Sequence, residues 1–487
     1  MVNRSEPHDR GLTVAVVGGG ASGTLTTVQL LRRAAARGGG LRVVLIDQYG
    51  RHGRGVAYST EHDAHLLNAV ASQMSAFADD PQHLIRWANA AGRECPGQPE
   101  SPAVTDTTFL PRATYGRYLR DVLAEADRHA QPAGQLTRVT AEVLAIRRND
   151  TGPAIRVVLG DGHLDADAAV LAVGNTPAAL PFDPVPGGRV ITDPWRPGAM
   201  AGLLGCVSAR SVVIVGTGLT MLDLAVAITA INPDAVVHAV SRHGMLPRPH
   251  PGTRPQLDRP VWPPAITRTS EDVRLADLIS QVRTAIAANP AGWHDVLGSL
   301  RPYVPGLWRR MPAADKRAFL RHLARYWEVH RHLVPPPTAS RIADLRRSGR
   351  LEIHRGRVQA ASPQNDRMRV LLHSADETIE LEADWLVNGT GGTTDISATP
   401  GPLLRDLFRS GLARPDPLRL GIDASTQGAV VDSAGAPSNA LYTLGPPLRG
   451  LWYDTTAIPE IRQQAAALAR LITSDEWRAQ RRPDSAA

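Results

Sequence analysis

The feature that most constrains this chain is a glycine-rich turn between an apolar strand and a helix near its start. Residues 14–17 read Val-Ala-Val-Val, and the turn at 18–23 reads Gly-Gly-Gly-Ala-Ser-Gly. A helical pattern and a second apolar strand follow, and that strand ends in Asp47. An acid about 20 residues beyond Gly-x-Gly-x-x-Gly is typical of βαβ units that bind dinucleotides. The sequence therefore predicts such a unit here.

Each residue type in this unit has a mechanical role. Gly18 permits the tight turn, Gly20 lets the backbone approach a pyrophosphate, and Gly23 lets the helix lie close to the strand. The helix N-terminus offers unpaired N–H groups to phosphates. Asp47 would accept hydrogen bonds from a ribose diol. In the loop beyond it, Arg54 is placed to contact a cofactor phosphate, with a solvated surface arginine as the alternative.

Length and composition indicate a globular protein of two or three domains. The chain has 487 residues, of which 43% are hydrophobic and 21% charged. The first residues lack an apolar signal-peptide core, and no apolar run approaches the roughly 18 residues that span a bilayer. We therefore expect a cytoplasmic protein that has no membrane partner.

Cysteine content and charge exclude further classes. Cys95 and Cys206 are far apart and form no C-x-x-C pair, so a disulfide framework and a flavin disulfide reductase are not expected. The net charge is +7, which could indicate nucleic acid. Because the excess is Arg-rich and spread along the chain, with no recognisable nucleic-acid module, anionic cofactors and an anionic substrate explain it at least as well.

The dinucleotide signal occurs a second time. An apolar strand at 211–215 precedes Gly216-Thr-Gly218-Leu-Thr220-Met221, a helix follows, and a strand ends in Ser241-Arg242. Met221 replaces the third glycine, so this helix and strand should sit slightly further apart. The acid is absent, and a Ser and an Arg would bind a 2′-phosphate that a carboxylate would repel. This half is therefore predicted to prefer NADPH to NADH, unless Arg242 is merely an exposed residue.

A helical segment separates the second unit from the strands that follow it. Helices are predicted over 272–288, 292–300 and 313–332, with many Arg, His and Trp residues. A metal site of His322, His330 and His332 is disfavoured because no carboxylate or cysteine joins them at a familiar ligand spacing. An anion-binding surface and a solvated basic face are the two remaining interpretations.

The last third of the chain predicts a return to the first domain. Residues 351–386 show strand and turn patterns and lead into Asn388-Gly-Thr-Gly-Gly. A short strand then enters a turn at Gly445, and a final long helix follows, with Thr455 or Thr456 as N-cap candidates. In a flavoprotein with two nucleotide sites, the N-terminus of such a helix could stabilise negative charge on the reduced flavin.

Together these motifs resemble the bacterial FAD/NAD(P)-binding monooxygenases that include FAD-dependent urate hydroxylases and nitrosuccinate-forming aspartate N-monooxygenases. The resemblance covers nearly the whole chain. The residues that carry it are Val17-Gly-Gly-Gly-Ala-Ser-Gly-Thr24, Gly53-Arg-Gly-Val-Ala-Tyr58, His65-Leu-Leu-Asn68, Pro111-Arg112, Tyr115-Gly116, Gly216-Thr-Gly-Leu-Thr-Met221, Ser241-Arg-His-Gly244, Arg321-His322, Trp327, His330-Arg331 and Ala457-Ile-Pro-Glu-Ile-Arg462.

The resemblance implies an α/β fold with two Rossmann-like dinucleotide-binding domains, for FAD and NADPH, and a helical insert. We expect the FAD-binding domain in 1–195 and 391–487, and the NADPH-binding domain in 196–390 with the insert at about 264–345. The expected FAD residues are Gly18, Gly20, Ser22, Gly23, Asp47, Arg54, Asn68, Gly445 and Thr456. The expected NADPH residues are Gly216, Gly218, Thr220, Ser241 and Arg242.

The resemblance also implies a flavin monooxygenase that needs no catalytic residue beyond the flavin. Hydride transfer to FAD, reaction with O₂ and oxygen transfer to a small anionic substrate would follow one another. The pocket is expected between the FAD domain and the insert, with Asn68 on one side. The expected substrate-binding residues are Arg112, Arg301, Arg321, His330 and Arg331.

Several functions remain open at this stage. We favour N-hydroxylation of an amino acid such as aspartate because the insert is rich in Arg and His, and urate, with stacking from Trp308 or Trp327, is the alternative. A flavoprotein reductase without oxygen insertion, a flavoprotein that acts on RNA and a non-catalytic FAD-binding protein are the other classes.

Overall fold

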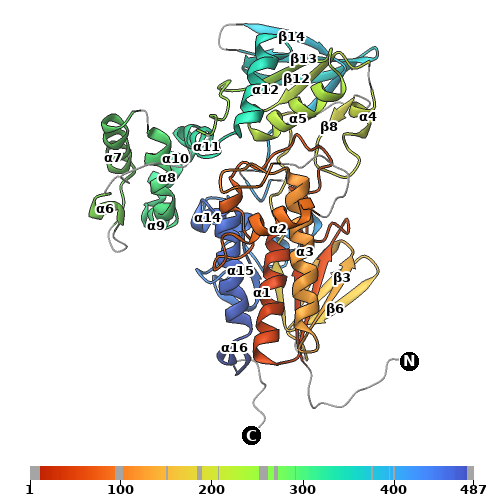
Figure 1. The fold of residues 1–487 in the computed structure, drawn as a ribbon, viewed down its shortest axis with the longest axis vertical. Helices are drawn as coiled ribbons and strands as arrows, with labels where there is room; N and C mark the ends of the chain where they lie inside the picture. The colour runs from red at the N-terminus through yellow and green to blue at the C-terminus, as the bar shows by residue number, and fades with distance from the viewer. Residues whose placement is uncertain are drawn as a thin grey trace.

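The protein consists of two parallel-sheet domains, one above the other, with a helical insert to one side (Figure 1). The computed structural model describes residues 11–93, 102–149, 152–183, 189–206, 208–251, 262–267, 272–290, 292–374, 377–393, 395–398 and 401–479. Cys95 lies outside these residues. None of the described helices is both long enough and apolar enough to cross a membrane.

The first sheet has six strands in the order β16-β17-β7-β1-β2-β3. Its strands are β1 (Leu12–Val17), β2 (Leu41–Asp47), β3 (Gly134–Thr140), β7 (Ala168–Leu171), β16 (Ala429–Val431) and β17 (Pro437–Thr443). All neighbours are parallel except β16 and β17, which are antiparallel. Two strands from the end of the chain thus complete a sheet that the first 171 residues begin.

Alternation along β1 explains how this sheet is covered on both faces. Val14 and Val16 pack into one buried cluster with α1 (Ala21–Arg37), α3 (Arg112–Ala130) and α15 (Ile458–Ile472). Ala15 and Val17 pack into a second cluster on the opposite face. That face carries β4 (Val143–Arg148), β5 (Ile155–Leu159), β6 (Gly162–Ala166) and α13 (Pro402–Arg409). The short α2 (His83–Arg93) and α16 (Asp475–Ala479) flank the helical layer.

The second sheet is entirely parallel, in the order β11-β10-β9-β15-β8. Its strands are β8 (Val190–Ile191), β9 (Ser211–Val215), β10 (Val236–Ser241), β11 (Leu351–Arg355) and β15 (Trp385–Asn388). One buried cluster holds residues of α5 (Leu219–Ile231) and α12 (Pro336–Arg347), with α4 (Ala201–Leu204) beside them. The other holds the three-stranded sheet of β12 (Arg357–Gln364), β13 (Arg367–His373) and β14 (Thr378–Ala383).

The insert follows β10 and projects beside both domains (Figure 1). It contains α6 (Pro264–Thr267), α7 (Leu275–Ala288), α8 (Trp293–Leu300), α9 (Val304–Arg310), α10 (Ala313–His322) and α11 (Ala324–Arg331). The prediction of one helix over 313–332 is wrong, because Leu323 has φ −119° and divides it in two. The segment contains no Gly or Pro to signal this break, so only the tertiary packing determines it.

The start of α15 also differs from its prediction. The helix begins at Ile458, with Ala457 as N-cap, and not at Thr455 or Thr456. Thr455 is fully buried, and its hydroxyl donates to the Gly445 carbonyl at 3.2 Å. That side chain therefore stabilises the preceding turn and cannot cap the helix.

Candidate functional site

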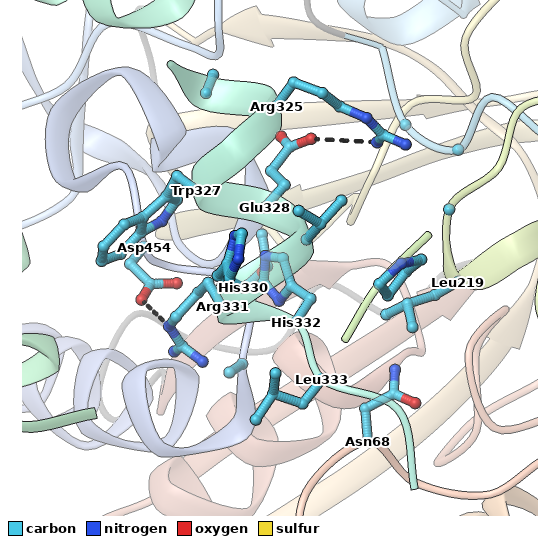
Figure 2. Close-up of a pocket in the computed structure, with 18 of the residues that line it drawn as sticks. Asn68, Leu219, Arg325, Trp327, Glu328, His330, Arg331, His332, Leu333 and Asp454 are labelled. Carbon is cyan, nitrogen blue, oxygen red and sulfur yellow. Dashed lines mark hydrogen bonds and ion pairs between the residues drawn. The ribbon is translucent and has the colours of Figure 1, made fainter. Parts of the chain in front are cut away.

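A hollow of about 2030 Å³ lies where the two domains and the insert meet. Its lining comes from the first domain (Tyr58, Asn68, Met74, Arg112), the second domain (Gly216, Gly218, Thr220, Arg242), the insert (Arg301, Arg321, Arg325, His330) and the segment before α15 (Asp454, Thr456, Ala457). Figure 2 shows side chains of α11 on one side of it and Asn68 and Leu219 on the other. Segments far apart in the sequence therefore share one cavity.

The first glycine turn is held by close backbone packing. Gly18 has φ +112°, and a Cβ there would lie 2.2 Å from the Ala172 carbonyl oxygen. A Cβ on Gly23 would lie 1.8 Å from the Gly18 oxygen, so no side chain fits at either position. Gly20 is the N-cap of α1, which has no side-chain cap among the described residues. The first amides of α1 are thus left for a ligand.

Two parallel helices point their N-termini toward the same turn. At their C-terminal ends, Arg33 of α1 donates to the Thr473 hydroxyl at 2.9 Å. At their N-terminal ends, Ser22 of α1 and Thr455, just before α15, both lie against Gly445. The positive ends of the two helix dipoles therefore converge, and an anion between them would be stabilised. This arrangement fits a pyrophosphate and a flavin that becomes anionic on reduction.

Asp47 ends β2 with both carboxylate oxygens engaged by the backbone. Oδ2 accepts the Gly19 amide at 3.0 Å, and Oδ1 accepts the amides of Tyr49 and Arg51 at 3.0 and 2.8 Å. The carboxylate therefore fastens the glycine turn to the loop that follows β2. A ribose diol would have to share these oxygens, so the predicted ribose contact stays a prediction.

Arg54 lies near two other arginines, Arg51 and Arg120, and one carboxylate, Glu61, so positive charge predominates around it. Its Nε is buried and has no hydrogen-bond partner in the described part of the chain. Burial lowers the pKa of Arg54, and the neighbouring Arg120 and Arg51 lower it further, opposed only by Glu61. The cluster lies beside the first turn, because the Gly55 backbone packs against Gly20. A cofactor phosphate would offset this excess charge, so these residues fit FAD.

The other residues predicted to bind FAD are placed in different ways. Asn68 and Thr456 line the hollow, whereas Ser22 is buried. Gly445 has φ +71°, its amide donates to the Gln464 side-chain oxygen at 2.8 Å, and its carbonyl accepts from Thr455. Its backbone therefore shapes the turn and has no free amide for a cofactor.

The second glycine turn opens directly into the hollow. Gly216 has φ +122° and a Cβ there would lie 2.3 Å from the Gly389 oxygen, whereas a Cβ on Gly218 would meet nothing within 4 Å. Thr220 lines the same space. Met221, at the position of the third glycine, is fully buried in the core of this domain. The open side of Gly218 leaves room for a phosphate group.

Ser241 and Arg242, at the end of β10, have different environments. The Ser241 hydroxyl lies 2.8 Å from the Thr217 hydroxyl and accepts the Gly244 amide at 3.0 Å. It therefore holds the turn together. Arg242 is exposed at the rim of the hollow, where its guanidinium is accessible to a phosphate.

Three further arginines, which were not predicted from the sequence, lie near His243 together with Arg242. The pKa of His243 is lowered by burial and then by four guanidiniums, those of Arg242, Arg325, Arg355 and Arg357. Arg325 comes from α11 of the insert, and its Nη2 donates to Thr217 and to the Met245 carbonyl, both at 3.0 Å. Parallel pairing of β10 with β11 brings Arg355 opposite Ser241, a contact that the sequence did not signal.

The candidate substrate-binding arginines fall into two groups, those paired with a protein carboxylate and those exposed to the hollow. Arg301 makes two bonds of 2.9 Å to Glu460, and the Nε of Arg331 donates to Asp454 at 2.9 Å (Figure 2). These two guanidiniums, and that of Arg112 described below, already face protein carboxylates. All three also line the hollow, so their role as substrate ligands stays a prediction.

Arg321 and His330 remain the more accessible members of that set. Arg321 is exposed on α10 and lines the hollow. His330 lies edge-on to Trp293, and its Nδ1 donates to the Tyr326 carbonyl at 2.8 Å. Within the described residues, His322, His330 and His332 do not come together as a metal-binding group.

A buried clamp, formed by Arg112, His65 and Asp223, joins the two domains at the hollow, which Arg112 also lines. Arg112 of α3 places Nη2 2.9 Å from the carboxylate of Asp223 on α5, and its Nε donates to the Leu66 carbonyl at 3.0 Å. His65 lies 3.0 Å from the Asp223 carbonyl through Nε2 and 2.7 Å from the Thr60 hydroxyl through Nδ1. Burial raises the pKa of Asp223, whereas Arg112 lowers it. The clamp links the N-terminal part of α5 to the first domain.

Comparison with known proteins agrees with the geometry of the first domain. Residues 15–176 match the FAD-NAD(P)-binding family model. They include the first glycine turn, Asp47, Arg54 and Asn68. FAD/NAD(P) binding is therefore assigned to this domain both by its local structure and by its similarity.

Two curated relatives are L-aspartate N-monooxygenases described as nitrosuccinate-forming. The protein from Streptomyces davaonensis is 33% identical over 199 residues, which cover 34% of this chain and 30% of that protein. The protein from Streptomyces cremeus is 28% identical over 284 residues, which cover 50% of this chain and 42% of that protein. The matched region thus spans less than half the length of either relative.

Solved structures show the same fold over nearly the whole chain. A complex of Kutzneria sp. 744 ornithine N-hydroxylase with reduced FAD, NADP⁺ and L-ornithine has a TM-score of 0.58 at 16% identity, covering 97% of this chain and all of that chain. L-lysine 6-monooxygenase from Pseudomonas syringae has a TM-score of 0.58 at 14% identity, covering 94% and 98%. The predicted α/β fold with two dinucleotide-binding domains is confirmed.

Removing one charged side chain of the clamp is predicted to lower the free energy of unfolding strongly. Asp223→Ala leaves the Arg112 guanidinium buried without its anion, so we expect a loss of about 3–5 kcal/mol in the free energy of unfolding, measured by urea denaturation. The double variant Arg112→Met/Asp223→Leu should recover most of it. Asp234→Ala, which removes an exposed ion pair near the other end of α5, is the control. Equal small effects of Asp223→Ala and Asp234→Ala would contradict the clamp.

His65 predicts a dependence of stability on pH. Burial lowers its pKa to about 4. As the pH falls below about 6.5, the imidazole binds a proton in the unfolded chain but not in the folded protein. The free energy of unfolding therefore decreases as the pH falls from about 6.5 to about 4. The loss at pH 5 is about 2 kcal/mol at 1.36 kcal/mol per pKa unit. His65→Gln should therefore lose less stability than wild type between pH 7 and 5 in urea titrations.

The exposed His163→Gln variant is the control for that experiment and should behave as wild type. Equal losses in wild type and His65→Gln would show that His65 is not the group responsible.

Proposed function

We propose that this protein is an FAD-dependent, NADPH-consuming monooxygenase that N-hydroxylates a small anionic amino acid such as aspartate. The FAD-binding domain would comprise 1–195 and 391–487, and the NADPH-binding domain 196–390. FAD would lie along the first glycine turn, with Arg54 on a phosphate and the N-termini of α1 and α15 facing its anionic groups. NADPH would lie along the second turn, with Arg242 on the 2′-phosphate.

One observation carries this proposal. The second glycine turn, the residues before α15 and the loop containing Asn68 all line the same hollow. A nicotinamide bound at Gly218 would therefore face the space in front of α15, where a flavin would lie. The hollow also reaches the insert, so a third molecule, the substrate, has a place beside both cofactors.

FAD, when bound, supplies the hydride acceptor and the oxygen chemistry. The residues of this chain bind and align it and exclude water from the site. The positive ends of α1 and α15 would stabilise negative charge on the reduced ring. Tyr58 has its pKa raised by burial to about 12, so it stays a neutral donor at this wall of the hollow.

The charge of the hollow supports an anionic substrate. Arg321 is exposed to it, and Arg317 lies on the same lining, whereas Arg301 and Arg331 are held by carboxylates. An amino acid with two carboxylates could use Arg321 as its recognition point and leave its amine free for oxidation. The two relatives named as L-aspartate N-monooxygenases support this choice.

The cofactor assignment predicts a selective effect at Arg242. Arg242→Ala should raise the NADPH KM by about tenfold or more, because a hydrogen bond to a charged group contributes about 1.5–3 kcal/mol. The NADH KM should hardly change, since NADH has no 2′-phosphate. Steady-state oxidation of both nucleotides measures this, with the exposed Arg346→Ala as the control. Equal effects on NADPH and NADH would exclude the assignment.

The substrate assignment is tested with purified holoenzyme and a panel of amino acids and purines. Aspartate should couple NADPH consumption to O₂ uptake and to an N-oxidised product. Arg321→Ala should raise the aspartate KM by about tenfold, the loss of one charge-assisted interaction, without changing the NADPH KM. Arg341→Ala, exposed on α12, is the control. Hydroxylated urate would support the alternative substrate, and substrate-independent NADPH oxidation would indicate a reductase.

A further inference from the structure

Three potential metal ligands meet on the second domain, on two neighbouring strands. His238 Nδ1 lies 3.2 Å from His354 Nε2 and 3.2 Å from the Glu352 carboxylate. His354 Nε2 lies 3.6 Å from the same carboxylate oxygen. Within the described residues this is the one group of three or more His, Cys, Asp or Glu side chains close enough to hold a metal ion.

The three distances match those between ligands of one ion. With Zn–N and Zn–O bonds of about 2.0–2.1 Å, tetrahedral ligands lie about 3.3–3.4 Å from one another. The observed edges of 3.2, 3.2 and 3.6 Å surround that value. An ion at the centre could therefore bind all three atoms with little movement of the strands.

Strand pairing explains why these side chains meet. β10 and β11 are parallel neighbours, and His238 pairs with Glu352 in register. Val237 and Ala239 are fully buried in the core under α5, so His238 points to the opposite face of the sheet. Glu352 and His354 are two residues apart and share one face of β11. The ligands thus stand on rigid strands, not on a loop.

Burial gives the site the form of an open metal centre. The side chains of His238 and His354 are 15% and 18% exposed, and that of Glu352 is 48% exposed. Two shielded nitrogens and one solvent-facing carboxylate leave a coordination position for water.

A hydrogen bond between the two imidazoles is the simpler interpretation of this cluster. One proton can join only two of the three atoms, whereas a cation satisfies all three at once and balances the carboxylate. We propose that His238, Glu352 and His354 form a binding site for a divalent transition metal, with Zn²⁺ as the ion that suits two nitrogens, one oxygen and a water.

The ion would attach the edge strand β11 to its neighbour β10. β11 is the last strand of its sheet, and the metal would link it to β10 at the pair His238–Glu352, three residue pairs before Ser241 and Arg355. It would therefore stiffen the ends of the strands that lead to the arginines near His243. The site itself does not depend on the proposed monooxygenase activity.

The test measures metal binding directly. Untagged, chelator-treated protein is dialysed against Zn²⁺ at neutral pH, and bound metal is quantified by mass spectrometry. We expect one equivalent of Zn²⁺ and a rise in the thermal unfolding temperature. Co²⁺ should give the visible absorption of a low-coordinate site. His238→Ala, Glu352→Gln and His354→Ala should each weaken binding by at least about tenfold, since loss of an outer-shell partner alone costs about 10–100-fold.

His163→Ala, which removes an exposed histidine from the first domain, is the matched control and should bind as wild type. Glu352→Gln keeps the size of a half-exposed side chain, so it tests the site even if a histidine variant does not fold. Zn²⁺ bound equally by wild type and by Glu352→Gln would place the metal elsewhere and overturn the proposal. Failure of the wild type to bind Zn²⁺ would do the same, whatever its NADPH oxidation.

Discussion

The buried ion pair between Arg112 and Asp223 is the interaction on which the site depends. Each dinucleotide-binding domain has its own sheet and core, so neither determines where the other lies. Arg112 and His65 both contact Asp223, near the start of the helix that follows the second glycine turn. Removing either partner would leave a buried charge without its counter-ion, so the pair strongly favours contact between the start of α5 and the first domain.

The same principle attaches the insert to the first domain. Arg301 is bound to Glu460 in the first turn of α15, and Arg331 is bound to Asp454 just before it. Arg449 of α14 (Arg449–Trp452) lies 2.9 Å from Glu328 of α11. These pairs place the insert beside the α15 N-terminus. Many arginines in this region therefore position elements, and only some of them are accessible to a ligand.

The division between paired and accessible arginines is a feature of the site that the sequence does not reveal. A sequence shows that Arg112, Arg301 and Arg331 are cationic, but not that Asp223, Glu460 and Asp454 balance them, because those acids lie 111 to 159 residues away. For the same reason, the sequence did not indicate a role for Arg325, Arg355 and Arg357. Their position near His243, beside Arg242, depends on parallel pairing of β10 with β11 and on the path of the insert.

The sequence by itself determined those features of the protein that depend on residues close together in the chain. The two glycine turns, the acid after one and the arginine after the other are short-range features of single βαβ units, so the fold class and the prediction of two nucleotide sites followed from residue types and spacing. The tertiary structure decided which charges neutralise one another, where the α10–α11 break falls, how α1 and α15 direct their N-termini to one point, and which histidines meet. These depend on contacts between distant segments, and strand or helix periodicity carries no information about them.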